Sequence, residues 1–144
     1  MNSKEPRTSL GLLILRVGTG GLLLYGHGWG KLMHFAEWAP KFPNPIGVGP
    51  ETSFVLVVFA EVVCSTLVAV GFLTRWACVP PVIFFLVAIF IQHAAAPFAE
   101  KELAMVYLVM FSTLLLTGGG KYSIDAAMGR RGGEVKPPIT TRAE

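Results

Sequence analysis

Four continuous apolar stretches dominate this chain of 144 residues. They run over about 9–32, 52–73, 76–92 and 102–117, and each supplies most of the roughly 20 residues that a helix needs to cross a bilayer. The stretches lack the alternation of polar and apolar residues that a lipid-facing barrel strand shows. Hydrophobic residues make up 53% of the chain, which exceeds the roughly 45–50% of soluble domains. The sequence therefore predicts an all-α membrane protein that folds as a bundle of four transmembrane helices.

Glycine marks the predicted ends of two of these helices. Gly71 follows the second stretch, and the run Gly118–Gly120 follows the fourth. Because glycine adopts the left-handed conformation that ends many helices, the second and third spans are predicted to form a tight hairpin that turns within residues 71–75. The longer connection at 33–51 carries four prolines and three aromatic residues. This composition predicts an irregular segment at the membrane–water interface.

The basic residues predict the orientation of the bundle. With the N-terminus inside, the cytoplasmic segments hold Lys4, Arg7, Arg75, Lys121, Arg130, Arg131, Lys136 and Arg142, whereas Lys31, Lys41 and Lys101 lie outside. Because lysine and arginine accumulate in cytoplasmic loops, both termini are expected in the cytoplasm. We expect a cytoplasmic N-terminus (1–8), a transmembrane domain (9–125) and a polar cytoplasmic tail without regular structure (126–144). The net charge of +3 then reflects topology, and no nucleic-acid partner is expected.

Two charged residues lie inside predicted spans, Arg16 in the first and Glu61 in the second. A charge at the bilayer centre costs ~2.5 to more than 10 kcal/mol unless a partner offsets it. Counted from the expected inner ends of their helices, Arg16 lies ~10 Å deep and Glu61 ~15 Å deep, a difference that an arginine side chain bridges. We therefore predict an ion pair between them. The pair is either a functional polar anchor or a structural clamp between the first two helices.

A second polar group is predicted at the outer end of the bundle. At about 100° per residue, one face of the first helix carries Arg16, Gly20, Leu23, His27 and Lys31. His27 reaches the outer boundary, where Gln92 and His93 end the third helix and Glu102 begins the fourth. This placement predicts an outer cluster of His27, His93 and Glu102. Such groups relay protons near neutral pH, ligate a metal, or only contact headgroups and water. Proton handling without a bound metal is the role we assign to them.

Several short motifs follow one another in an order that is typical of one family. They are Leu15–Arg16, the glycine-rich segment 22–32, Glu61 leading to 71–75, His93, Glu102, and the segment 118–125 that ends at Asp125. On these motifs the chain resembles the DoxX family of small bacterial four-helix membrane proteins, from about Leu12 to Asp125.

The resemblance implies a multi-pass protein of the bacterial cytoplasmic (inner) membrane that is connected with redox biology. One relative, the DoxD-type subunit, belongs to a thiosulfate:quinone oxidoreductase, and others are associated with oxidative-stress or quinone-responsive systems. This chain lacks the larger two-part arrangement of the thiosulfate enzyme. The resemblance therefore favours a quinone over thiosulfate as the small molecule involved.

Three functions remain open at this point. The first is an accessory subunit that binds a quinone or another lipophile, with Arg16, Glu61, Lys31 and Gln92 as ligand-binding residues and the outer cluster handling protons. The second is a non-catalytic membrane anchor or scaffold for a redox-protein partner. The third is a small proton-coupled transporter, which would work as a homodimer. Because no haem, flavin or iron–sulfur ligand pattern is evident, the chain is at most an oxidoreductase subunit without its own redox cofactor.

Overall fold

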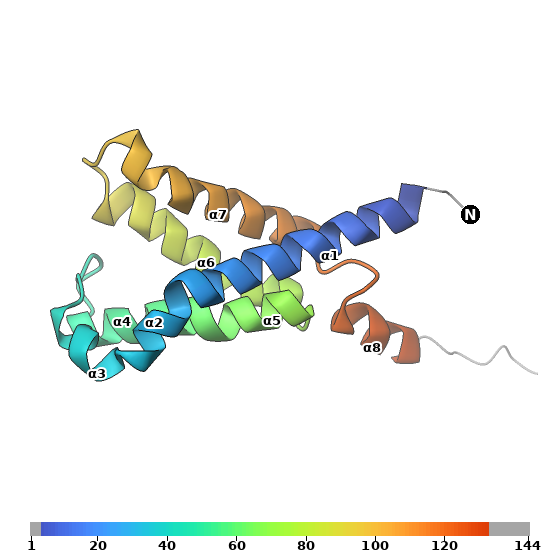
Figure 1. The fold of residues 1–144 in the computed structure, drawn as a ribbon, viewed down its shortest axis with the longest axis horizontal. Coiled ribbons are helices and arrows are strands. Elements are labelled where there is room, and N and C mark those ends of the chain that lie inside the picture. The colour runs from blue at the N-terminus through green and yellow to red at the C-terminus, as the bar shows by residue number, and fades with distance from the viewer. Residues whose placement is uncertain (1–3, 133–144) are drawn as a thin grey trace, which may run out of the picture.

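The computed structural model describes residues 4–132, and the regular structure in this part of the chain is helical, with no strand. The first long helix consists of α1 (Lys4–Leu23), a π-helical segment (Leu24–Gly28) and α2 (Trp29–Met33). The second consists of α4 (Pro50–Val58), a π-helical segment (Phe59–Cys64) and α5 (Ser65–Val70). The third is α6 (Thr74–Val87) continued by the π-helical segment Ala88–Gln92, and the fourth is α7 (Phe98–Thr117). Figure 1 shows these four rods lying side by side.

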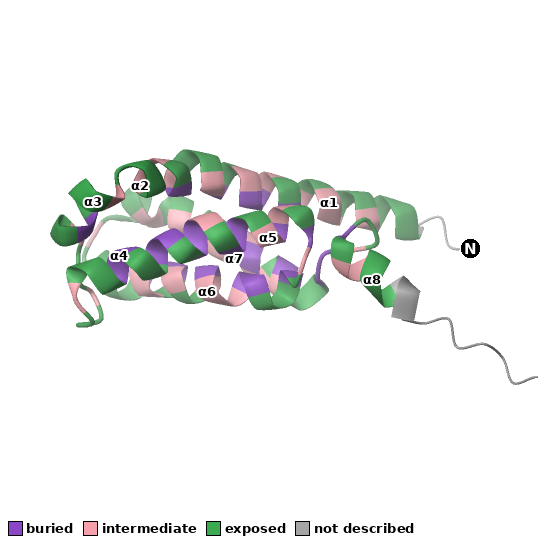
Figure 2. Cartoon of the chain, turned by 90° about the horizontal axis from the view of Figure 1, so that it is seen from below, coloured by how far each residue is buried: buried purple, intermediate pink, exposed green. Residues whose placement is uncertain are grey.

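The lengths and compositions of these rods suit a bilayer. Among the described residues, three helices are long and apolar enough to cross a membrane, over Glu5–Met33, Pro50–Val70 and Thr74–Gln92. The fourth, α7, has 20 residues and carries Glu100, Lys101 and Glu102 in its first turns before an apolar run. Large apolar side chains point outward on these helices, and Trp76 and Leu116 are each 77% exposed. The exposed positions run along the length of the bundle (Figure 2). An apolar outer surface of this extent marks a membrane interface, and the chain is an all-α membrane protein.

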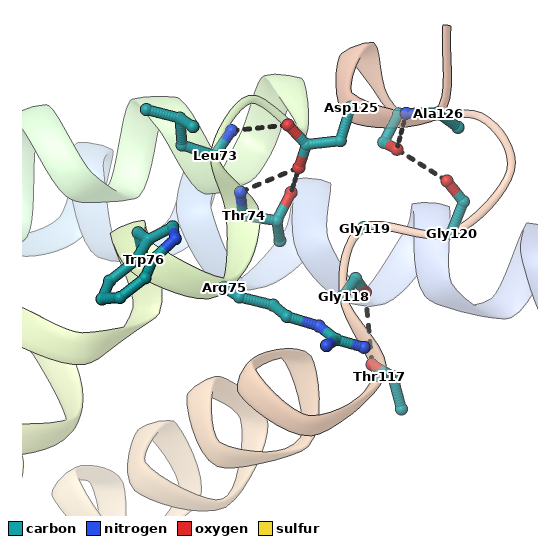
Figure 3. A pocket seen from close by; sticks show the side chains of 11 residues that line it. Leu73, Thr74, Arg75, Trp76, Thr117, Gly118, Gly119, Gly120, Asp125 and Ala126 are labelled. Atoms are coloured by element: carbon teal, nitrogen blue, oxygen red, sulfur yellow. Dashed lines mark hydrogen bonds between the residues drawn. The ribbon is translucent and has the colours of Figure 1, made fainter. Parts of the chain in front are cut away.

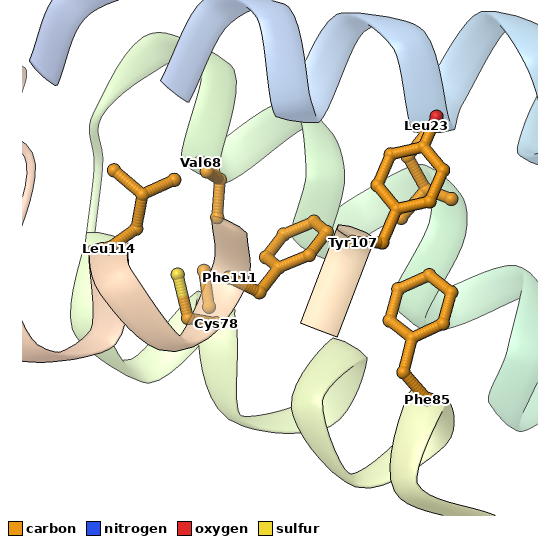
Figure 4. Close-up of a cluster of buried hydrophobic side chains, with 8 residues drawn as sticks. Leu23, Val68, Cys78, Phe85, Tyr107, Phe111 and Leu114 are labelled. Carbon is orange, nitrogen blue, oxygen red and sulfur yellow. The ribbon is translucent and has the colours of Figure 1, made fainter. Parts of the chain in front are cut away.

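All four rods contribute to one central core. Leu23, Val68, Phe85, Tyr107, Phe111 and Leu114 are almost fully buried there together with Cys78 and Ala77 (Figure 4). The Phe85 and Tyr107 rings stack with a centroid distance of 5.4 Å, which joins α6 to α7. Lipid is as apolar as this core, so the burial of apolar side chains from water does not hold the helices together. Close packing has to do so.

Two glycines set the register between the first two rods. A Cβ atom added at Gly20 would collide with the backbone oxygen of Ser65, and one added at Gly28 would lie 2.6 Å from that of Glu61. The first helix therefore runs antiparallel to the second with residue 20 beside residue 65 and residue 28 beside residue 61. Other glycines of the first helix do not make such contacts, because a Cβ at Gly18 or Gly21 would meet nothing within 4 Å.

Both predicted helix ends are confirmed. Gly71 caps α5 with φ 76°, and Gly118 caps α7 with φ 76°. The hairpin between α5 and α6 closes with Leu73, whose φ of 49° is also left-handed. The longer connection differs from the prediction in its first half, because α3 (Phe35–Trp38) and a 3-10 turn (Ala39–Lys41) form there. Phe35 packs on Phe54 of α4 with a ring distance of 5.2 Å, and this contact orders the segment.

The two predicted cytoplasmic segments are more regular than expected. Helix α1 already begins at Lys4, and helix α8 (Ile124–Gly132) occupies the start of the tail that was expected to lack regular structure. The Ser123 hydroxyl caps α8, because its Oγ accepts a hydrogen bond of 3.1 Å from the Ala126 amide. Residues 1–3 and 133–144 lie outside the described residues. The beginning of α1 extends past the end of α5, and α8 lies at that same end of the bundle (Figure 1).

Candidate functional site

Glu61 forms an ion pair with Lys31 and not with Arg16. The Lys31 Nζ atom lies 2.6 Å from Glu61 Oε2, in a charge-assisted hydrogen bond. The Glu61 side chain is 3% exposed and that of Lys31 19% exposed. The predicted pairing of Arg16 with Glu61 is therefore wrong, because the partner of Glu61 is a different basic residue of the first helix.

The register of the two helices explains this exchange of partners. Arg16 lies beside Ala69, and position 69 is eight residues from position 61, which is about 12 Å along a helix. Lys31 lies one turn beyond Gly28, the residue that touches the Glu61 backbone. The predicted depths were wrong because the ends of the two helices are not level. The beginning of α1 extends past the end of α5, so Arg16 lies beside the last turn of the second helix, at the end of the bundle that is predicted to be cytoplasmic (Figure 1).

Arg16 instead joins three parts of the chain at the end of the bundle that is predicted to be cytoplasmic, and we call this the inner end. Its Nη1 donates to the carbonyl oxygen of Ala69 at the end of α5, and its Nη2 donates to that of Tyr122 at 2.7 Å. The residue is 3% exposed. Arg16 thus ties α1 to α5 and to the segment that precedes α8, and we name these contacts the inner clasp.

Asp125 completes the inner clasp from α8. Its Oδ1 accepts a hydrogen bond of 2.7 Å from the Leu73 amide, and its Oδ2 accepts bonds of 2.9 Å and 2.8 Å from the Thr74 amide and hydroxyl. These contacts border an open cleft of about 430 Å³ between Arg75, Gly118 and Asp125 (Figure 3). Because the carboxylate satisfies the first amides of α6, its role is that of a helix cap supplied by a distant segment.

The environment of Asp125 predicts an acid sensitivity. Partial burial alone would raise the pKa of Asp125, but hydrogen bonds from Thr74 and Leu73 and the nearby Arg16 charge outweigh it and lower the pKa. A carboxyl group whose pKa is lower in the folded state stabilises the fold at neutral pH, and this stabilisation is lost as the pH falls below about 4. We expect Asp125→Asn to be less stable than the unmodified protein at pH 7 and the difference to shrink at pH 3.5. Thermal unfolding in detergent at both pH values measures it. Glu100→Gln, at an exposed carboxylate, is the control, and an equal loss in both variants would contradict the prediction.

A second cavity, of about 520 Å³, opens in the half of the bundle that is predicted to face away from the cytoplasm, which we call the outer half. Its walls come from α4, the third rod and the proline-rich connection, and they include Phe42, Ile46, Leu56, Val57, Phe59, Ile83, Phe84 and Val87. Four polar residues interrupt this apolar lining: Lys31, Ser53, Gln92 and His93. We name this space the outer cavity. Its volume falls within the range of roughly 300–1,000 Å³ that is usual for small-molecule sites.

The edge of the outer cavity faces away from the bundle. Leu56, Phe59 and Ile83 line it, and each of them is about half exposed. In a membrane, an exposed apolar edge at this level meets the acyl chains. A lipophilic molecule therefore has a lateral route from the bilayer into the cavity.

Ser53 is the least expected member of the lining. It is 5% exposed, and its Oγ has no hydrogen-bond partner among the described residues. A buried hydroxyl without a partner costs about 1–3 kcal/mol. Because one bond rotation redirects the hydroxyl hydrogen, a polar group on a molecule in the outer cavity can supply the missing partner.

The predicted outer cluster does not form. His93 lines the outer cavity, whereas His27 packs edge-on against Tyr107 at 6.0 Å, and Glu102 is exposed on α7. Among the described residues, no three His, Cys, Asp or Glu side chains are grouped so that they could hold a metal. His27 lies at the level of Tyr107, whereas Glu102 lies five residues away from Tyr107 along α7 and His93 follows the end of the third rod, so the three residues do not meet. Of the predicted ligand-binding residues, Lys31 and Gln92 line the cavity, Glu61 lies behind Lys31, and Arg16 belongs to the inner clasp.

The sequence reasoning missed the cavity walls and the π-helical segments. Three such segments occur within residues 4–132, and they contain His27, Glu61 and Gln92 respectively. Wide helical turns of this kind often occur at functional sites. No apolar pattern marks the π-helical segments. The sequence did hold two signals for the cavity wall, which are the serine in the run that begins α4 and the prolines at 43, 45 and 80.

Comparisons with known proteins agree with this picture of a small helical membrane protein. The sequence model of the DoxX family matches residues 11–94, which include every residue that lines the outer cavity. The chain is 30% identical over 128 residues to the uncharacterized membrane protein Rv3486 of Mycobacterium tuberculosis (strain ATCC 25618 / H37Rv), and the match covers 77% of each chain. No solved structure matches the chain. The family match over more than half of the residues, together with this relative, shows that the chain belongs to the DoxX family.

Proposed function

We propose that this DoxX protein binds a lipophilic small molecule of the quinone class in the outer cavity. In this proposal it acts as an accessory subunit of a redox or oxidative-stress system in the bacterial inner membrane. The observation that carries the proposal is the outer cavity itself. It is apolar, it has an edge exposed at the level of the acyl chains, and it holds a few polar groups among its lining residues.

The polar residues suit the head of a quinone. A quinone ring carries two carbonyl oxygens, which accept hydrogen bonds and take up protons when the ring is reduced. Lys31, Gln92 and Ser53 offer donors to such oxygens. His93 is exposed where it lines the cavity, so it is the residue of the predicted outer cluster to which we still assign proton handling.

The apolar walls suit the isoprenoid tail of the same molecule. Phe42, Phe59 and Phe84 present ring surfaces, and Val57 and Val87 fill the space between them. Burial of apolar area from water contributes little for a molecule that already resides in lipid. Binding would therefore depend on shape and on the polar head, which makes both testable by substitution.

Filling the cavity is expected to abolish quinone binding. Ala88 lines the outer cavity, and Ala88→Trp would place a large ring in the space. The protein is incubated with decylubiquinone in mild detergent, unbound quinone is removed, and the retained quinone is quantified by liquid chromatography. We expect the unmodified protein to retain quinone and Ala88→Trp to retain less by a factor of ten or more.

A tryptophan outside the cavity provides the matched control. Val109 is 65% exposed on α7 and does not line the outer cavity, so Val109→Trp should retain as much quinone as the unmodified protein. Equal retention by Ala88→Trp, or no retention by the unmodified protein, would overturn the proposal. Proteins that copurify are identified by mass spectrometry in the same preparation, because an accessory subunit should bring a redox partner with it.

A further inference from the structure

We infer that the outer cavity selects neutral lipophiles with a carbonyl or hydroxyl head and rejects anionic lipids such as fatty acids. Glu61 is the specificity determinant in this inference, although it does not itself line the cavity. The inference rests on the proposed function, because it concerns the same cavity, and it adds the charge and the polar group that an occupant must have.

The charge of the cavity wall depends on one basic residue. Lys31 is the only lysine or arginine among the described residues that line the outer cavity. A free ammonium group beside apolar walls would bind the carboxylate of a fatty acid or the phosphate of a lipid. Lys31 is not free, because its Nζ lies 2.6 Å from Glu61 Oε2.

The charge that neutralises Lys31 lies outside the space of the cavity. Glu61 is 2% exposed and lies behind Lys31, so it cancels the ammonium charge without taking up space in the cavity. An anionic head brought to Lys31 would approach this carboxylate in surroundings of low dielectric constant, where like charges repel strongly. A neutral carbonyl oxygen meets no such repulsion and can still accept a hydrogen bond from Lys31.

The occupant must also supply a polar group for Ser53. Two other hydroxyl side chains of the second rod bond to backbone oxygens of their own helix, Ser65 to Ala60 at 3.2 Å and Thr66 to Val62 at 2.7 Å. Ser53 has no such partner among the described residues, although it is buried and lines the cavity. A carbonyl or hydroxyl on the occupant would satisfy it, whereas a hydrocarbon chain would leave it unsatisfied.

Removal of the Glu61 charge tests whether this residue sets the selectivity of the cavity. Decylubiquinone is bound to the full chain in phosphatidylcholine nanodiscs, and the oleate concentration that displaces half of it is measured. Oleate should displace quinone poorly from the unmodified protein. Glu61→Gln frees the Lys31 charge, so oleate should then displace quinone at a concentration at least about tenfold lower. The double variant Lys31→Gln/Glu61→Gln carries neither charge and keeps an amide donor at position 31, so oleate should displace quinone from it less readily than from Glu61→Gln.

Ser53 tests the inference independently of Glu61. Ser53→Ala should weaken decylubiquinone binding by about five- to tenfold, the effect of one hydrogen bond. Thr66→Ala removes an exposed hydroxyl from the same rod and should leave binding unchanged. If Glu61→Gln is not recovered as folded protein, oleate displacement from the unmodified protein still tests the selectivity, because ready displacement would overturn it, and Ser53→Ala tests the head-group contact. Unchanged binding by Ser53→Ala would overturn the proposed head-group contact.

The two proposals fail in different ways. If the unmodified protein retains no quinone, or Ala88→Trp retains as much of it, the proposed function is wrong. If quinone binds in the cavity but oleate displaces it equally well from the unmodified protein and from Glu61→Gln, only the inferred selectivity is wrong.

Discussion

Replacing Arg16 with methionine is expected to lower the free energy of unfolding by about 3 kcal/mol. The substitution keeps a long side chain but removes the donors that hold the carbonyl oxygens of Ala69 and Tyr122. It also removes the cation near Asp125. Both carbonyls then lie near the bundle end without their partner, and the junction of α1, α5 and α8 loosens. Unfolding by SDS titration and thermal unfolding in detergent measure the loss.

Two further variants show whether the geometry or the charge of Arg16 matters. Arg16→Lys keeps the charge, but a single ammonium cannot present the forked donors of a guanidinium, so most of the loss should persist. Arg75→Met removes an exposed arginine and should change stability little. An Arg16→Met protein as stable as the unmodified one would show that relief of the buried charge offsets the lost hydrogen bonds.

Replacing Gly20 with alanine is expected to separate the first two helices and to cost about 1–3 kcal/mol. The added Cβ would collide with the backbone oxygen of Ser65 and lie 3.0 Å from the Cβ of Ala69. Neither atom belongs to a flexible side-chain end, so the helix itself must move. The same measurements of unfolding apply.

Gly18→Ala is a matched control on the same helix, two residues away. Its added Cβ would meet nothing within 4 Å, and alanine favours a helix over glycine, so stability should stay equal or rise. Equal losses at both positions would mean that helix flexibility matters here and not close packing. Gly28→Ala extends the test to function, because its Cβ would lie 2.6 Å from the Glu61 backbone oxygen. We expect it to disturb the Lys31–Glu61 pair and to weaken quinone retention.

Features that depend on a short segment were predictable from the sequence. The hairpin at Gly71 and the end of α7 at Gly118 follow from a local backbone preference, and the structure confirms both. The start of α8 was missed, although Ser123 caps it locally. That helix also depends on Asp125, whose partners are Leu73 and Thr74, about fifty residues away in the chain.

The candidate site was only partly predictable, for a related reason. Depth along a helix can be counted from the sequence, and this counting correctly placed Lys31, Gln92 and His93 at one end of the bundle. The direction of a side chain around the helix depends on the exact helical phase. π-helical segments change this phase, and His27, Glu61 and Gln92 each lie within one.

Apolar length, glycine caps and motif order are local properties of the chain, and they are enough to establish a helical membrane protein of the DoxX type. The need of Arg16 and Glu61 for partners also follows from the sequence, since an isolated charge is too costly in hydrocarbon. The identity of these partners depends on how the helices pack. The close approach at Gly20 and Gly28 fixes the register of two antiparallel helices, and this register places Glu61 beside Lys31 and Arg16 beside Ala69.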